Sequence, residues 1–102
     1  MSYFYVYVLM SEIDNQFYTG YTSDLRQRLK EHNRGNVKST QNRRPLKLVY
    51  FEGCLNQQDA THREKYLKTT YGKRYLKNRL RNYLPCEITE EKSHKVNPVR
   101  KR

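Results

Sequence analysis

Runs of apolar residues in the first half of the chain predict three β-strands. Residues 3–10 are aromatic, β-branched or aliphatic throughout, which is typical of a strand buried on both faces. A polar turn follows, and residues 16–21 predict a second strand that forms a hairpin with the first. Gly20 lies inside this second strand and indicates a close backbone approach or a bulge. Residues 46–54 predict the third strand.

Apolar positions at helical spacing predict a first helix after the hairpin. We expect it to begin after an N-cap at Ser23, with Asp24 in its first turn, and to end near Gly35. The spacing i, i+3, i+4, i+7 gives it an inner face made of Leu25, Arg28, Leu29 and His32. Residues 36–45 are polar and basic without periodicity, and therefore predict an exposed loop.

Two more helices are expected after the third strand. The first, over residues 57–70, is capped by Asn56 and ended by Gly72. Its inward stripe consists of Ala60, Glu64, Leu67 and Tyr71. The second covers residues 73–84 and ends at Pro85. Its apolar face consists of Leu76, Leu80 and Leu84.

The order β-β-α-β-α-α predicts an α+β fold, in which helices pack against a three-stranded, largely antiparallel sheet. A chain of 102 residues has room for one domain with a modest core and a shallow surface site. We expect this domain to span residues 1–84. Residues 85–102 are polar and without periodicity, and predict a flexible tail.

The charge of the chain indicates a polyanionic partner. It has 21 Lys and Arg residues against ten Asp and Glu, and a formal net charge of +11. Residues 85–102 hold five basic and three acidic side chains, so a charge of +9 belongs to residues 1–84. Nucleic acid fits this charge better than an acidic small molecule. Charge alone leaves other interpretations open, namely a merely solvating surface or an RNA-coating protein.

Hydropathy and cysteine content indicate in which cellular compartment the protein is expected. The longest apolar run is far shorter than the ~18 residues of a membrane-spanning helix, so no membrane association is expected. No secretory signal is recognisable, and two cysteines are too few for a disulfide scaffold. We therefore expect a cytoplasmic protein.

Three polar residues occupy helix faces that should be apolar. Glu64 lies on a buried stripe, where a carboxylate must be paired, hydrogen-bonded or bound to a metal ion. Arg28 and His32 are neighbours on the face of the first helix. Structural explanations remain open for each: an ion pair for Glu64, an Arg28 stem laid on the core edge, and a helix-end position for His32. Their joint occurrence favours a site.

Together with nearby tyrosines, these residues supply most of what phosphodiester hydrolysis requires. Tyr3, Tyr5 and Tyr7 share one face of the first strand, and Tyr18 lies in the second. A phenolate can deprotonate water. Arg28 suits a phosphate, because a guanidinium matches its oxygens. One divalent cation on Glu64 would stabilise the leaving oxygen, and the basic surface would hold the strand.

The same residues resemble the pattern of the GIY-YIG nuclease superfamily, in a small single-domain form like the nuclease module of excision-repair enzymes. Residues 5–7 (Tyr-Val-Tyr) and 18–20 (Tyr-Thr-Gly) stand where that superfamily has its two signature tripeptides. Tyr5 replaces the first glycine, and Thr19 replaces the isoleucine. The resemblance covers roughly residues 3–84. It assigns catalytic roles to Tyr7, Tyr18, Arg28, His32 and Glu64.

The resemblance implies an endonuclease that hydrolyses DNA with one Mg²⁺ or Mn²⁺ ion held by Glu64. Tyr7 would act in proton abstraction with His32, and Arg28 and Tyr18 would position the phosphate. Arg26, Lys68 and Gly20 are candidates for substrate contacts. The chain has no zinc-ligand spacing and no recognisable DNA-reading module. We therefore expect low sequence specificity, or specificity supplied by a protein partner. The alternative is a nucleic-acid-binding module that uses the same fold without cleavage.

Overall fold

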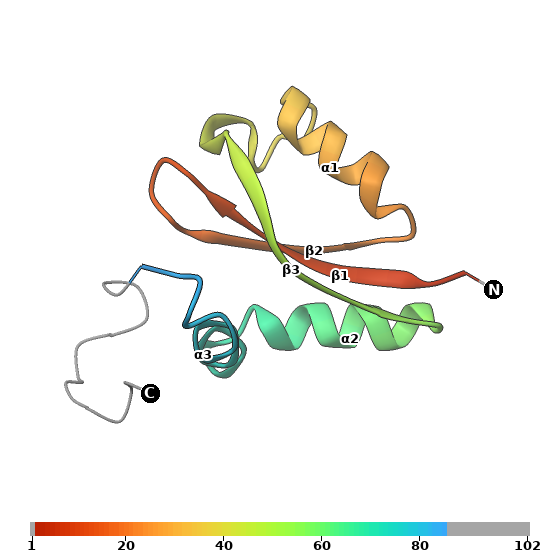
Figure 1. Ribbon diagram of the computed structural model, residues 1–102. Helices are drawn as coiled ribbons and strands as arrows, with labels where there is room; N and C mark the ends of the chain where they lie inside the picture. The colour runs from red at the N-terminus through yellow and green to blue at the C-terminus, as the bar shows by residue number, and fades with distance from the viewer. Residues whose placement is uncertain (1, 86–102) are drawn as a thin grey trace, which may run out of the picture.

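A computed structural model describes residues 2–85, which form a three-stranded sheet between two layers of helices (Figure 1). The elements in chain order are β1 (Phe4–Ser11), β2 (Phe17–Thr22), α1 (Leu25–Arg34), the short 3-10 helix η1 (Gln41–Arg43), β3 (Leu46–Cys54), α2 (Gln57–Leu67) and α3 (Thr70–Arg79). The sheet is antiparallel with strand order β2-β1-β3. This confirms the predicted α+β fold and element order. Helix α1 covers one face of the sheet, and α2 and α3 cover the other.

The central strand β1 contributes to a hydrophobic core on each face of the sheet. Val6 and Val8 point to one face and pack with Ala60, Leu67 and Leu76 of α2 and α3. Tyr7 and Leu9 point to the opposite face, where Leu25 and Leu29 of α1 pack against them. Because successive side chains of a strand alternate between faces, a continuous apolar run supplies both cores, as the sequence predicts.

The ends of α1 follow the predicted chemistry with one correction. The N-cap is Asp24 and not Ser23, and its side chain accepts a hydrogen bond from the backbone N–H of Gln27 at 3.1 Å. A carboxylate satisfies a free N–H and also interacts favourably with the helix dipole. Gly35 ends the helix in the left-handed conformation, with φ of 85°. This conformation is the reason for a glycine there.

The boundary between α2 and α3 lies earlier than the sequence analysis predicts. Helix α2 ends at Leu67, and Thr69 caps α3 by accepting a hydrogen bond from the backbone N–H of Gly72 at 3.1 Å. Gly72 therefore lies in the first turn of α3 and does not end α2. A Cβ at Gly72 would overlap the carbonyl oxygen of Tyr66, so this glycine allows the two helices to meet closely.

Several smaller predictions in the second half of the chain are also corrected. Tyr71 belongs to α3 and is 68% exposed, so it is not part of the inward stripe. Helix α3 ends at Arg79, well before Pro85, although Leu76 and Leu84 are buried as expected. The loop 36–45 is not wholly exposed, because it contains η1 and a fully buried Thr40.

The predicted tail cannot be compared with the structure, because residues 86–102 lie outside the described part of the chain. The division at residue 84 therefore stays a prediction. Within residues 2–85, no helix has the length and apolar character needed to cross a membrane.

Candidate active site

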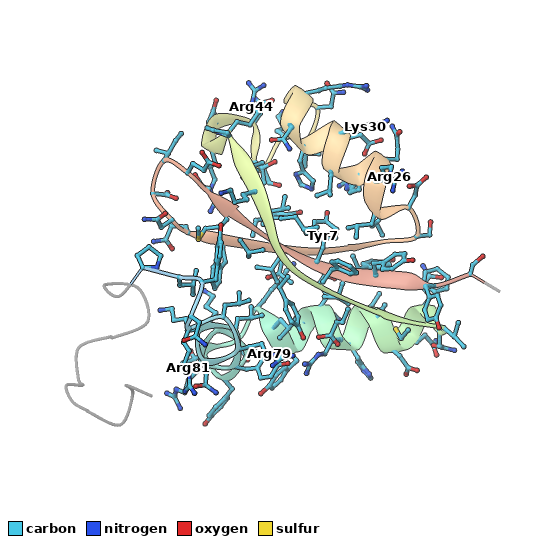
Figure 2. All side chains as sticks on the ribbon, viewed as in Figure 1. Tyr7, Arg26, Lys30, Arg44, Arg79 and Arg81 are labelled. Carbon is cyan, nitrogen blue, oxygen red and sulfur yellow. The ribbon has the colours of Figure 1, made fainter. Side chains whose placement is uncertain are left out.

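Tyr7 is the centre of the candidate site. It lies on β1 with 1% of its surface exposed, between the sheet and α1 (Figure 2). Its strand partner in β2 is Gly20. A Cβ at position 20 would be 2.6 Å from Tyr7 Oη and 2.8 Å from Cζ, so the ring occupies the space that any other residue would fill. The close approach predicted at Gly20 is therefore made by a side chain, and the β1–β2 pairing passes it in regular register.

His32 holds the Tyr7 hydroxyl from the α1 side. Its Nε2 atom is 2.9 Å from Tyr7 Oη, and its Nδ1 atom is 2.8 Å from Thr40 Oγ1. The Thr40 hydroxyl donates in turn to the carbonyl of Val37 at 3.5 Å. We assign the histidine tautomer from this network: Nδ1 donates to Thr40, and Nε2 accepts the proton of the Tyr7 hydroxyl. His32 is thereby fixed as an acceptor for Tyr7.

Burial keeps both members of this pair uncharged. It lowers the pKa of His32 to about 4, and the charge of Arg28 acts in the same direction. It also raises the pKa of Tyr7, although the hydrogen bond from Arg28 partly opposes this increase. At neutral pH the imidazole is therefore unprotonated and accepts a hydrogen bond, and the phenol still holds its proton.

Arg28 places its guanidinium beside the same hydroxyl. Its Nε donates to Tyr7 Oη at 3.4 Å, and its Nη1 pairs with Glu31 Oε1 at 2.8 Å. The side chain is 36% exposed, so it is partly accessible from the solvent. The head group of Arg28 therefore contacts a buried phenol in addition to the solvent.

Tyr18 completes the aromatic surroundings of the site from β2. Its ring centroid is 6.4 Å from that of Tyr7 and 5.2 Å from that of His32, in tilted and edge-on geometries. Such arrangements are favourable for aromatic rings. The structure thus brings together four of the five predicted catalytic residues: Tyr7, Tyr18, Arg28 and His32.

Glu64 lies on α2, against the other face of the sheet. Its side chain is 17% exposed and forms an ion pair with Lys68 at 3.0 Å, while Ala60 and Leu67 on the same stripe are buried. No hydrogen bond or ion pair joins it to Tyr7, Arg28 or His32 among residues 2–85. Its charge is nevertheless among the causes that raise the pKa of Tyr7, after burial and the nearer groups. Glu64 is therefore coupled to Tyr7 electrostatically but not by contact.

The described residues can hold one weakly bound divalent ion. They contain no group of three or more His, Cys, Asp or Glu side chains arranged around a common point. Oε2 of Glu64 is 3.0 Å from Lys68 Nζ, so a divalent ion on Glu64 would share the carboxylate with this lysine or displace it. A single carboxylate with water and substrate oxygens is an ordinary environment for Mg²⁺. The donor set does not fit a two-metal centre.

The sequence analysis missed two residues that orient the site. Thr40, the partner of His32, lies in a loop without periodicity, and no sequence signal predicts its burial. Glu31, the partner of Arg28, is three residues further along α1, where the spacing of opposite charges is a usable signal. Of the candidate substrate contacts, Arg26 lies exposed on α1 (Figure 2) and Lys68 is 54% exposed beside Glu64.

Comparisons with known proteins show the family of this chain. The model of the GIY-YIG catalytic domain family matches residues 3–80. A UPF0213 protein of Clostridium perfringens is 48% identical over 65 residues, which are 63% of this chain and 69% of the relative. A UPF0213 protein of Streptococcus pyogenes is 36% identical over 91 residues, covering 88% and 94% of the two chains.

A solved structure supports the same assignment. The solution NMR structure of a UPF0213 protein from Bacillus halodurans is 29% identical to this chain, with a TM-score of 0.50. The match covers 90% of this chain and 99% of the other. The chain therefore belongs to the GIY-YIG catalytic domain family, and within it to the UPF0213 proteins.

Proposed function

We propose that this protein is a metal-dependent endonuclease that hydrolyses phosphodiester bonds in DNA with low intrinsic sequence specificity. The observation that carries the proposal is the Tyr7 hydroxyl, which lies between the acceptor Nε2 of His32 and the donor Nε of Arg28. A purely structural tyrosine needs one partner for its hydroxyl. Here a neutral base can take the proton, and a fixed cation can stabilise the phenolate that remains.

In the reaction that we propose, His32 Nε2 accepts the hydroxyl proton of Tyr7, and the Tyr7 phenolate takes a proton from a water molecule. The resulting hydroxide attacks phosphorus, the bond from phosphorus to the leaving oxygen breaks, and that oxygen acquires a proton from solvent. His32 then gives the proton that it accepted back to solvent, so Tyr7 and His32 both return to their resting protonation states. The shifted pKa values of Tyr7 and His32 oppose the first transfer in the resting protein. The partly accessible side chain of Arg28 would offset this cost by neutralising the phosphate and the phenolate together.

Glu64 is the residue that would hold a divalent ion, Mg²⁺ or Mn²⁺. Such an ion, when bound, supplies Lewis-acid stabilisation of charge on the phosphoryl and leaving oxygens. The protein's contribution is a carboxylate fixed between two buried residues of α2. Lys68 must release Oε2 or share it, which gives this lysine a direct effect on metal affinity.

One observation favours a second function, a binding module that does not cut. Lys68 already neutralises Glu64, as it would in a site that never takes up a metal ion. The charge of +11 would serve such a module equally well. In this case DNA would bind without metal and without products. A protein partner that supplies specificity is compatible with either function.

A cleavage panel decides between these functions. Branched, nicked and single-stranded DNA are incubated with the protein in Mg²⁺ or Mn²⁺, and products are followed over time. We expect cleavage that Glu64→Ala and Arg28→Ala each reduce by at least about 100-fold. Glu12→Ala and Arg34→Ala remove exposed residues of the same types and should cut at the wild-type rate. If Glu64→Ala cuts as fast as the wild type, the proposed site is wrong.

A further inference from the structure

Three aromatic side chains form an open strip beside the candidate active site. Tyr3, which precedes β1, Tyr5 of β1 and Phe51 of β3 follow one another, with ring centroids 6.3 and 6.1 Å apart. Tyr3 is 48% exposed and Phe51 is 51% exposed. Gly53 is the strand partner of Tyr5 and has no side chain that could cover the rings. A Cβ at this position would already be 3.3 Å from both tyrosines. We call these three rings the aromatic shelf.

A groove joins the shelf to α1. Its volume is about 490 Å³, and the residues that line it include Tyr5, Phe51, Leu25, Leu29, Arg26 and Asp24. Asp24 is occupied as the N-cap of α1, so its carboxylate is turned to the helix backbone. Arg26 supplies positive charge at the rim, and Lys30 follows it one turn later on α1 (Figure 2). The groove therefore combines an apolar floor with a cationic edge.

The shelf is directly next to the reaction centre. Tyr5 and Tyr7 are two residues apart on the same face of β1, which corresponds to about 7 Å along the strand. Leu25 and Leu29, which line the groove, are also the residues of α1 that pack over Tyr7. A DNA strand with its phosphate at Arg28 and Tyr7 would thus bring a neighbouring base to the shelf.

Unpaired bases fit this surface best. Aromatic side chains bind nucleic acid by stacking on base faces, which a duplex hides in its own stack. A cationic edge favours a phosphate backbone over an apolar peptide or an uncharged ligand. We propose that the aromatic shelf binds an unpaired base of single-stranded DNA next to the scissile phosphate. This inference rests on the proposed function and specifies its substrate class, DNA with an unpaired segment at the cut site.

The absence of tryptophan from the sequence allows a direct test. Phe51→Trp places a single fluorescent indole on the shelf, where stacking with a base should quench it. The full-length variant is titrated, without metal ions, with an unstructured single-stranded DNA, the matching duplex and a single-stranded RNA. Anisotropy of labelled DNA reports binding independently. Ile13→Trp is the control, because Ile13 is 65% exposed in the turn at the other end of β1, between Glu12 and Asp14.

The expected result is strong quenching of the Phe51→Trp indole by single-stranded DNA and little by duplex, with the Ile13→Trp indole unchanged. Phe51→Ala should weaken single-strand binding roughly tenfold, and Phe51→Trp should restore it. Anisotropy that reports binding without quenching would overturn the inference, as would equal quenching by duplex or stronger quenching by RNA. A failure of the nuclease proposal can be distinguished from a failure of this inference. In that case single-stranded DNA quenches the Phe51→Trp indole, but no cleavage occurs in Mg²⁺ or Mn²⁺.

Discussion

The Tyr7 hydroxyl lies over Gly20 so closely that a Cβ at position 20 would be only 2.6 Å from it. Gly20→Ala must therefore move the phenol away from His32 or push β2 aside. We expect this variant to lose about 1–3 kcal/mol of stability, as overpacking does in a core, together with most of its cleavage activity. Urea unfolding and cleavage rates provide the measurements.

Gly53→Ala is the matched control, because a Cβ there would be 3.3 Å or more from its nearest neighbours, against 2.6 Å at Gly20. Gly53→Ala should lower the unfolding free energy by less than Gly20→Ala does. Equal unfolding free energies for the two variants would show that Tyr7 does not depend on the space at Gly20.

The buried His32 makes stability depend on pH. Its pKa is about 4 in the folded protein and 6.5 in an unfolded chain, so the unfolded chain binds an extra proton between these values. The stability that the neutral, buried His32 provides is fully present above pH 6.5 and is lost as the pH falls towards 4. The difference between the two pKa values corresponds to about 3 kcal/mol of unfolding free energy. His32→Gln should flatten the unfolding free energy against pH in this window, and the same slope in both proteins would contradict the assignment.

Tyr7→Phe removes the hydroxyl and keeps the ring, so it distinguishes the chemical role of Tyr7 from its packing role. It keeps the packing over Gly20 but leaves Nε2 of His32 without its donor, which should cost about 1–3 kcal/mol of stability. Cleavage should fall by about 100- to 10,000-fold, as expected for loss of a general base, while DNA binding measured by anisotropy stays within a factor of two. Tyr71→Phe, on an exposed tyrosine of α3, serves as the control. A Tyr7→Phe protein that cuts at the wild-type rate would exclude the phenol from the chemistry.

Lys68 is expected to compete with the metal ion for Glu64, since the two side chains are 3.0 Å apart. Lys68→Met removes the competing charge and should lower the Mn²⁺ concentration that gives half-maximal cleavage about two- to fivefold, the range of an exposed ion pair. Lys65→Met, on an exposed lysine of the same helix, should not change it. If Lys68 instead contacts DNA, the metal midpoint stays constant and the KM for DNA rises.

Much of the fold follows from local patterns in the sequence. The boundaries of β3 are predicted correctly because an apolar and aromatic run stands between polar segments, and the inner face of α1 because helical periodicity is strong there. The junction of α2 and α3 is not, since Gly72 reads as a helix breaker while its actual role is to let α3 pack against the end of α2. That role depends on contacts between helices, which local propensity does not contain.

The same distinction applies to the candidate site. Residue types and helical spacing place Arg28 and His32 on one face of α1, and the strand period places Tyr7 on one face of β1, but only the structure shows that these two faces meet. The contact of Thr40 with His32 cannot be predicted from the sequence, because only the tertiary fold brings the loop before η1 next to His32. The relation of Glu64 to Tyr7 is also not readable from the sequence, which shows an inward carboxylate but not on which face of the sheet it lies.

The most direct test of the account is whether Arg28 and Glu64, from opposite faces of the sheet, act on one reaction. Single-turnover cleavage of one nicked DNA in Mn²⁺ is compared for the wild type, Arg28→Ala, Glu64→Ala and the double variant. Residues that act as a unit are strongly non-additive, so we predict that the double variant is no slower than the slower single variant. Losses that multiply in the double variant, or a wild-type rate in Glu64→Ala, would contradict a common centre.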